Sequence, residues 1–341
     1  MHFDFLICSE RSGSNLMTKI LNAHPQVCGP FPSHLFRNFA WNYLRYGDLR
    51  IDSTWETFVE DVVFYMAHIF AEWKTLVSVE ELRALEQRSL AAVGRVIYEK
   101  EAADHGKSRV FVKENHTWSF IEYLLSHFPE ARFLWVVRDP RDMALTWRTL
   151  ASGGVVRAVD TWLQDQRGSL RAYSMLRDIG RMKLVRFEDL VTDPETCTRG
   201  VCDFLGLTYS ATMLGFHTDA LVRSNARRIV SWQDLDSPID PRAVGVFRDG
   251  LGEAEIRYVD GRCAAEMRLF GYTAELHKPG DPPVSVDDLP PADAYDREQT
   301  PAEQRAYAGF REGVARIRSR NLSTAETGIE SLLEPWNLRL R

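Results

Sequence analysis

The sequence contains no long hydrophobic run. Nowhere do about 18 consecutive apolar residues occur, which is the length that a membrane-spanning helix needs. The first segment with the pattern of a buried strand also begins within a few residues of Met1, so we expect no secretory signal peptide. These two absences predict a protein without a membrane span.

Cysteine is also scarce, with five residues in a chain of 341. They form no CxxC pair and no Cys/His spacing of the kind that holds a metal. Reduced thiols in a cytoplasmic protein are the simplest interpretation. The net charge of −6 argues against general nucleic-acid binding, although it leaves room for a local basic cleft.

A strand, a small-residue turn and a helix follow one another at the N-terminus. Residues 3–8 are apolar and predict a buried strand, residues 9–15 predict a turn, and residues 16–21 place apolar side chains at helical spacing. Such a turn directs backbone N–H groups at the helix N-terminus toward an anion. The sequence therefore predicts a phosphate-binding loop.

This loop lacks two side chains that a nucleotide-hydrolysing P-loop requires. On the pattern GxxxxGK[ST], Ser14 takes the place of the lysine that clamps the nucleotide, and Asn15 takes the place of the hydroxyl residue that holds Mg²⁺. The substitutions disfavour a metal-dependent kinase and favour an enzyme that binds another phosphate ester.

A second strand with a basic end lies further along the chain. Residues 132–137 predict a buried strand, which ends in Arg138 and is followed by a helical pattern that contains Thr146, eight residues later. Ligands of open α/β sheets bind outside the carboxyl ends of the strands. Arg138 and Thr146 are therefore candidates for a second anion site.

The two motifs together resemble those of sulfotransferases that use 3′-phosphoadenosine 5′-phosphosulfate (PAPS). The resemblance implies that the loop holds the 5′-phosphosulfate and that Arg138 and Thr146 hold the 3′-phosphate. The loop residues concerned are Arg11, Ser12, Gly13, Ser14, Asn15 and Leu16. It also implies that PAPS is the co-substrate, that 3′-phosphoadenosine 5′-phosphate (PAP) is the product, and that no metal takes part.

Further segments extend the resemblance over roughly residues 3–272. They include His24-Pro25 after the first helix, Phe128-Pro129 before the second phosphate strand, and Arg186-Phe187-Glu188-Asp189-Leu190. A C-terminal segment with Ser231 and Arg248 resembles the family's segment that folds over the nucleotide, so both are candidate nucleotide contacts. Val246 and Phe247 stand where the family commonly has Arg and Trp.

The expected fold is α/β, a P-loop-like parallel sheet in three layers, as in sulfotransferases. We expect one such domain over residues 1–277, with a helical insertion at about 33–105 that walls the acceptor pocket. Helical patterns in this insertion cover 33–46, 54–73 and 79–102. A Pro-rich, acidic linker at 278–301 precedes a C-terminal extension, 302–341, with helices expected at 302–319 and 323–333.

The chemistry also needs a cation for the leaving phosphate and a base for the acceptor. Lys113 ends an apolar strand in a chain with seven lysines, and the resemblance implies that it stabilises the leaving group together with Arg11. His34 is the favoured base. His116 and Glu114 remain alternatives, since Asn115 takes the strict position where small-molecule members carry a histidine.

These patterns predict transfer of a sulfuryl group from PAPS to a hydroxyl or amine acceptor. A P-loop kinase and a non-catalytic nucleotide-binding protein are the alternatives. The sequence does not separate a small molecule, a glycan, a lipid and a peptide as the acceptor, and it does not decide between a monomer and a homodimer. We expect no nucleic-acid partner.

Overall fold

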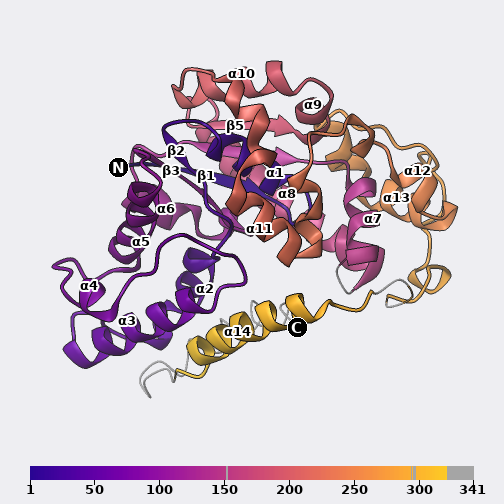
Figure 1. The fold of residues 1–341 in the computed structure, drawn as a ribbon. Helices are drawn as coiled ribbons and strands as arrows, with labels where there is room; N and C mark the ends of the chain where they lie inside the picture. Colours follow the sequence, from indigo (N-terminus) through magenta and orange to yellow (C-terminus); the bar gives the residue numbers. More distant parts are fainter. Residues whose placement is uncertain (151–152, 293, 295–296, 321–341) are drawn as a thin grey trace.

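The chain is built around one parallel β-sheet (Figure 1). The structure is a computed structural model that describes residues 1–150, 153–292, 294 and 297–320. The strands lie in the order β2-β3-β1-β4-β5 and all pairs are parallel. Their bounds are β1 His2–Cys8, β2 Val27–Cys28, β3 Arg109–Lys113, β4 Phe133–Val137 and β5 Met182–Arg186. The predicted parallel α/β fold is confirmed; the short edge strand β2 was missed.

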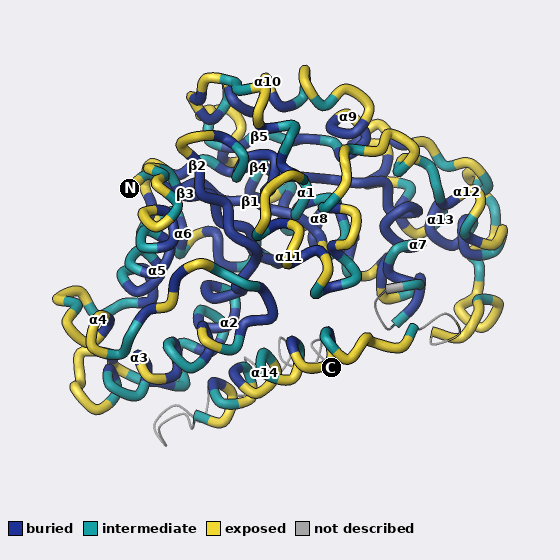
Figure 2. Tube along the Cα trace, viewed as in Figure 1, coloured by how far each residue is buried: buried dark blue, intermediate teal, exposed yellow. Residues whose placement is uncertain are grey.

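Side chains of the central strands alternate between two hydrophobic cores, because successive residues of a strand point to opposite faces of a sheet. Phe5 and Ile7 of β1 belong to one core, whereas Leu6 and Cys8 belong to the other. Figure 2 shows the sheet as the most buried part of the molecule. Helices cover both faces, which gives three layers.

Helices fill the segments between and after the strands. Their bounds are α1 Ser14–Asn22, α2 Leu35–Trp41, α3 Asp52–Ala67, α4 Val79–Arg83, α5 Leu90–Asp104, α6 Ile121–His127, α7 Pro140–Leu150, α8 Gly154–Leu176, α9 Phe187–Thr192, α10 Pro194–Leu205, α11 Ala220–Arg228, α12 Phe247–Gly250, α13 Glu253–Leu269 and α14 Pro301–Arg318. The 3₁₀ helix Val230–Asp236 follows α11. Within the described residues, no helix is long and apolar enough to cross a bilayer.

The helical insertion consists of α2–α5, between β2 and β3. The prediction of one continuous helix over 79–102 is wrong, because α4 ends at Arg83 and α5 begins only at Leu90. The separate caps explain the break: Ser78 caps α4, and the Ser89 hydroxyl accepts a hydrogen bond from the first turn of α5. The helix predicted to reach residue 73 ends at Ala67.

The C-terminal extension lies against the insertion. The helix predicted at 302–319 is confirmed as α14, which packs on α3, α2 and α11 (Figure 1). The helix predicted at 323–333 lies outside the described residues. α14 therefore closes one side of the molecule beneath the carboxyl ends of the strands.

Candidate active site

A cavity of about 1130 Å³ lies where β1, β3, β4 and β5 end. Its volume exceeds that of a typical pocket for one small ligand, so it is large enough for a nucleotide and an acceptor together. Ten of the residues predicted from the sequence line it: Arg11, Gly13, Ser14, Asn15, Leu16, His34, Lys113, Arg138, Thr146 and Ser231. Ser12 and Arg248 do not line it.

The loop after β1 requires glycine at position 13. Gly13 has φ +83°, and a Cβ atom placed there would lie 2.2 Å from the ring of Phe187. Arg11 is also left-handed, with φ 69°. Ser12 is buried and donates from its hydroxyl to the carbonyl of Ser9, 2.8 Å away, so it shapes the loop from behind.

The first turn of α1 faces the cavity with backbone N–H groups that have no intrahelical partner. Ser14, Asn15 and Leu16 line the cavity there. The Nε of Arg11 is buried without a hydrogen-bond partner, and desolvation lowers the pKa of its guanidinium. A buried donor without a partner is costly. The loop is therefore suited to an anion that would accept these donors.

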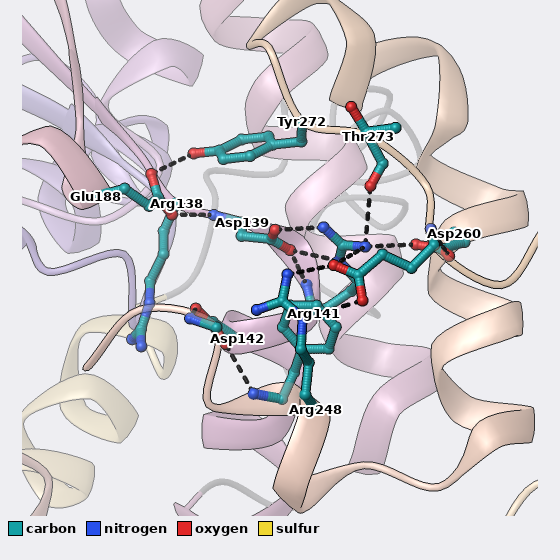
Figure 3. Close-up of polar contacts among 12 residues, drawn as sticks. Arg138, Asp139, Arg141, Asp142, Glu188, Arg248, Asp260, Tyr272 and Thr273 are labelled. Carbon is teal, nitrogen blue, oxygen red and sulfur yellow. Dashed lines mark hydrogen bonds and ion pairs between the residues drawn. The ribbon is translucent and has the colours of Figure 1, made fainter. Parts of the chain in front are cut away.

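Arg138, at the end of β4, is buried and turned toward the loop. Its Nη1 lies 3.3 Å from the carbonyl of Arg11 and its Nη2 lies 3.0 Å from the carbonyl of Ala243, whereas its Nε has no partner. The guanidinium stacks on the Phe187 ring at 4.4 Å. Figure 3 shows it pointing away from the ion pairs around Arg141.

The turn that follows Arg138 anchors the C-terminal segment at the cavity. Both oxygens of Asp142 accept backbone N–H bonds, from Gly245 at 2.7 Å and from Phe247 at 2.9 Å. Glu188 accepts the N–H of Asp139 at 2.9 Å. These bonds fix the segment beside the strand ends (Figure 3).

Two nucleotide contacts predicted from the sequence have different surroundings. Thr146 lines the cavity, and its hydroxyl donates to the carbonyl of Asp142, 2.9 Å away. Arg248 is exposed and forms an ion pair with Glu275, outside the cavity (Figure 3). The structure thus brings Thr146 and Arg138 together and leaves Arg248 apart.

Lys113, at the end of β3, is a buried cation. Its Nζ donates to the Oδ1 of Asn115 at 2.7 Å, and burial lowers its pKa. Within the described residues, neither Lys113 nor Arg11 nor Arg138 forms an ion pair with a carboxylate. Unpaired charges in a low-dielectric site are costly. Three of them around one cavity indicate an anionic ligand.

His34 is the histidine that faces this cavity. It is the N-cap of α2 with φ 56°, it is 5% exposed, and its Nδ1 has no hydrogen-bond partner. Burial holds its pKa well below the usual 6.5, and the charges of Arg37 and Lys113 add to this. A neutral imidazole with a free ring nitrogen therefore lies beside the cations.

The two alternative bases are engaged elsewhere. The Nδ1 of His116 lies 3.0 Å from the Oδ1 of Asp165, and His116 does not line the cavity. Glu114 accepts the backbone N–H groups of Phe36 and Arg37, at 3.1 and 2.7 Å, and so caps α2. Burial nevertheless raises the pKa of Glu114 to about 7.

Some residues that shape the site were not predicted as site residues. Phe187 contacts both the loop and Arg138, and it stands in the segment 186–190 quoted above. Asp142 anchors the segment at Gly245, and it lies between Arg138 and Thr146 in the sequence. Tyr307 and Phe310 of α14 also line the cavity. No local signal connects these two residues with the loop, some 300 positions away.

Comparison with known proteins decides the family. The model of the sulfotransferase family matches residues 5–211. The chain belongs to the sulfotransferase family. It is 28% identical over 225 residues to protein-tyrosine sulfotransferase 2 of Gallus gallus, an alignment that covers 62% of this chain and 52% of that protein. The chain thus spans about half the length of this relative.

A second relative of this chain is the nodulation protein NoeE of Sinorhizobium fredii. The two are 23% identical over 307 residues, with 81% of this chain and 67% of that protein covered. Among solved structures, the sulfotransferase domain from the curacin biosynthetic pathway has a TM-score of 0.58 at 18% identity, covering 81% of this chain and 99% of that one. The domain from the Synechococcus PCC 7002 olefin synthase has a TM-score of 0.55 at 19% identity, covering 80% and 96%. These structures share the fold.

Proposed function

We propose that this chain transfers the sulfuryl group of PAPS to an acceptor hydroxyl and releases PAP. The observation that supports this most directly is the set of cations around one cavity, Arg11, Lys113 and Arg138, which have no carboxylate partners among the described residues. A doubly phosphorylated nucleotide would satisfy all three. Family membership supports the same reaction over phosphoryl transfer.

In this proposal the two phosphate groups of the nucleotide bind at separate loops. The first turn of α1 and Arg11 would hold the 5′-phosphosulfate through backbone N–H groups and a guanidinium. Arg138 and Thr146 would hold the 3′-phosphate, and Ser231 lines the cavity as a further contact. Ser14 and Asn15 stand where a kinase would have Lys and a Mg²⁺ ligand, which supports transfer without a metal.

Sulfuryl transfer would proceed in line. A bond forms between the acceptor oxygen and sulfur while the bond between sulfur and the bridging phosphate oxygen breaks. The electron pair of the broken bond stays on the phosphate of PAP, where Lys113 and Arg11 would stabilise the growing negative charge. The acceptor proton would pass to a ring nitrogen of His34, which lines the cavity and is neutral because burial lowers its pKa.

The test combines radiolabelled PAPS, a panel of hydroxyl acceptors and three single variants. We expect His34→Ala to lower kcat by roughly 10²–10⁴-fold while PAP affinity changes little. Lys113→Ala is expected to lower kcat by a comparable factor, since its charge is matched to the transition state. His116→Ala, which keeps the cavity lining intact, is the matched control.

Different outcomes would contradict different parts of the proposal. Wild-type kcat in His34→Ala with a dead His116→Ala variant would move the base to His116. Wild-type kcat values in both His34→Ala and His116→Ala would favour Glu114 as the base. Absence of PAP binding to the wild type would overturn the sulfotransferase proposal itself, and ATP- and Mg²⁺-dependent transfer would favour the kinase alternative.

A further inference from the structure

The C-terminal helix α14 presents one face to the candidate active site. Tyr307 and Phe310 line the cavity from this face, and Gly313 and Ile317 are buried further along the same side of the helix. Residues at such i, i+3 and i+4 spacings share a face of an α-helix. The opposite side is exposed and polar, with Arg311 and Glu312 in solvent.

Two buried carboxylates hold α14 in place, one near each end. Glu303 accepts the backbone N–H of Val230 at 2.9 Å and pairs with Arg297 at 2.7 Å. Asp61 of α3 is 1% exposed and accepts from Arg316 and Arg320, each at 2.6 Å. One end of α14 is therefore tied to the 3₁₀ helix Val230–Asp236, which lines the cavity, and the other end to α3 of the insertion.

α14 also packs closely enough on α3 for ring contacts to form. A Cβ atom at Gly313 would lie 3.1 Å from the ring of Tyr65, so the two helices approach each other closely at this position. One turn earlier, Phe310 meets Tyr65 with ring centroids 5.7 Å apart. The close approach brings the aromatic face of α14 over the insertion.

The rings of α14 complete an aromatic enclosure around His34. Phe310 meets the ring of His34 at 6.3 Å and that of Phe70 at 4.9 Å, edge to face in both cases. Tyr307 meets Phe70 at 5.3 Å, and Phe70 meets Trp232 at 5.5 Å. The imidazole proposed to take the acceptor proton thus has the rings of Phe70 and Phe310 beside it, in addition to the nearby cations.

Tyr307 occupies the position between this enclosure and the anion loop. Its side chain lines the cavity, and the charges of Glu10 and Arg11 both act on its phenol. Burial is the main reason that the pKa of Tyr307 is raised, to about 12, so the phenol stays neutral. A neutral donor therefore faces the place where acceptor and sulfuryl group would meet.

We propose that α14 is the acceptor-side wall of this site and that Phe310 and Tyr307 determine which acceptors reach His34. The acceptor class that fits is a hydroxyl on an aromatic or otherwise apolar body, because rings line the approach to His34 and would leave the other hydroxyls of a sugar without partners. The inference rests on the proposed sulfuryl transfer. It assigns to the extension a role in specificity.

The test uses the chain of 341 residues and four variants, one of which is Tyr307→Phe. Phe310→Ala opens the wall, Phe310→Leu keeps an apolar side chain there, and Arg311→Ala is the matched control on the exposed face of the same helix. The wild type and each variant are assayed with radiolabelled PAPS as the donor and, in separate reactions, 2-naphthol, maltotetraose or a tyrosine-containing peptide as the acceptor. PAP affinity is measured by calorimetry, and PAPS hydrolysis is followed without acceptor.

We expect the wild type to favour 2-naphthol, and Phe310→Ala to lower kcat/KM for it by roughly 10- to 100-fold, the scale on which pocket contacts discriminate substrates. PAP affinity should stay within about twofold and hydrolysis of PAPS by water should rise, because the wall no longer excludes solvent. Phe310→Leu should recover most of the activity, and Arg311→Ala should match the wild type. Tyr307→Phe should lower kcat without changing PAP affinity.

Several results would overturn this inference while leaving the proposed function intact. One is unchanged kcat/KM in Phe310→Ala and Tyr307→Phe. Another is a fall in PAP affinity as large as the fall in kcat/KM, since the effect would then reach beyond the acceptor. A wild-type preference for maltotetraose over both phenols, 2-naphthol and the tyrosine of the peptide, would refute the apolar acceptor class. A wild type that binds no PAP refutes the proposed function instead.

Discussion

Arg138→Ala should remove the preference of this protein for a nucleotide with a 3′-phosphate. Arg138 is 9% exposed, its Nε has no partner, and its two other nitrogens reach only backbone carbonyls, those of Arg11 and Ala243. Its charge is therefore uncompensated by any described carboxylate. We expect a bound 3′-phosphate to supply the missing counter-charge in this desolvated position.

The magnitude follows from that environment. Truncating one partner of a buried, hydrogen-bonded charge pair costs about 2–4 kcal/mol in binding. At 25 °C this corresponds to a rise in the Kd for PAP of roughly 30- to 900-fold. AMP lacks the 3′-phosphate, so its Kd should change by less than about threefold. The unfolding free energy should fall by no more than about 1 kcal/mol. The variant loses the two hydrogen bonds from Arg138 to backbone carbonyls, but it also no longer has to bury an unpaired charge.

Isothermal titration calorimetry at fixed ionic strength measures both nucleotides, and urea denaturation measures stability. Lys183→Ala is the matched control, because it removes one positive charge from β5 at a residue that does not line the cavity. It should leave both Kd values within about twofold. Equal losses for PAP and AMP in Arg138→Ala, or no loss for either, would refute the assignment of Arg138 to the 3′-phosphate.

Four further outcomes are expected. Burial holds the pKa of His34 well below 6.5, and the neutral ring is the active form, so kcat/KM should stay level as the pH falls to 6.5 and decline only below it. A decline with its midpoint above pH 6.5 that is lost in His34→Ala would contradict this. Gly13→Ala should lower the unfolding free energy in urea by at least about 1–2 kcal/mol, because φ +83° and the Phe187 ring both oppose a Cβ; wild-type stability would refute the loop geometry. EDTA should change kcat by less than about twofold, whereas a tenfold loss would correspond to about 1.4 kcal/mol in the activation free energy. Activity that EDTA abolishes and that Mg²⁺ restores would favour the kinase alternative. Arg248→Ala should change the Kd for PAP by less than about threefold because Arg248 is exposed and paired with Glu275; a loss like that of Arg138→Ala would show that it turns inward on binding.

Local patterns were sufficient to predict the central strands β1 and β4 and the turns that follow them. β1 with its glycine turn and α1, and β4 with Arg138 and Thr146, are continuous segments whose geometry follows from neighbouring residues. Hydrophobic runs and turn residues encode such units directly. The edge strand β2 was missed because two residues carry no periodicity, and the break between α4 and α5 was missed because capping serines resemble ordinary polar positions.

The surroundings of the three candidate bases depend on tertiary packing. From the sequence, His34 is the favoured base and His116 and Glu114 are the alternatives. In the structure, Glu114 lies where α2 begins and caps it, while His116 meets Asp165, which is 49 positions further along the chain. The packing of α2 and α8 on the segment after β3 separates them, and His34 is the one of the three that lines the cavity.

The sequence by itself determined which residues can bind an anion, because a strand, a glycine turn and a helix N-terminus form from adjacent positions. Only the tertiary structure decided what surrounds that anion. Burial removes the water that would otherwise screen Arg11, Lys113 and Arg138, and long-range packing brings Tyr307 and Phe310 of α14 to the same cavity. Those contacts join residues hundreds of positions apart, and their energy comes from surfaces that no local pattern specifies.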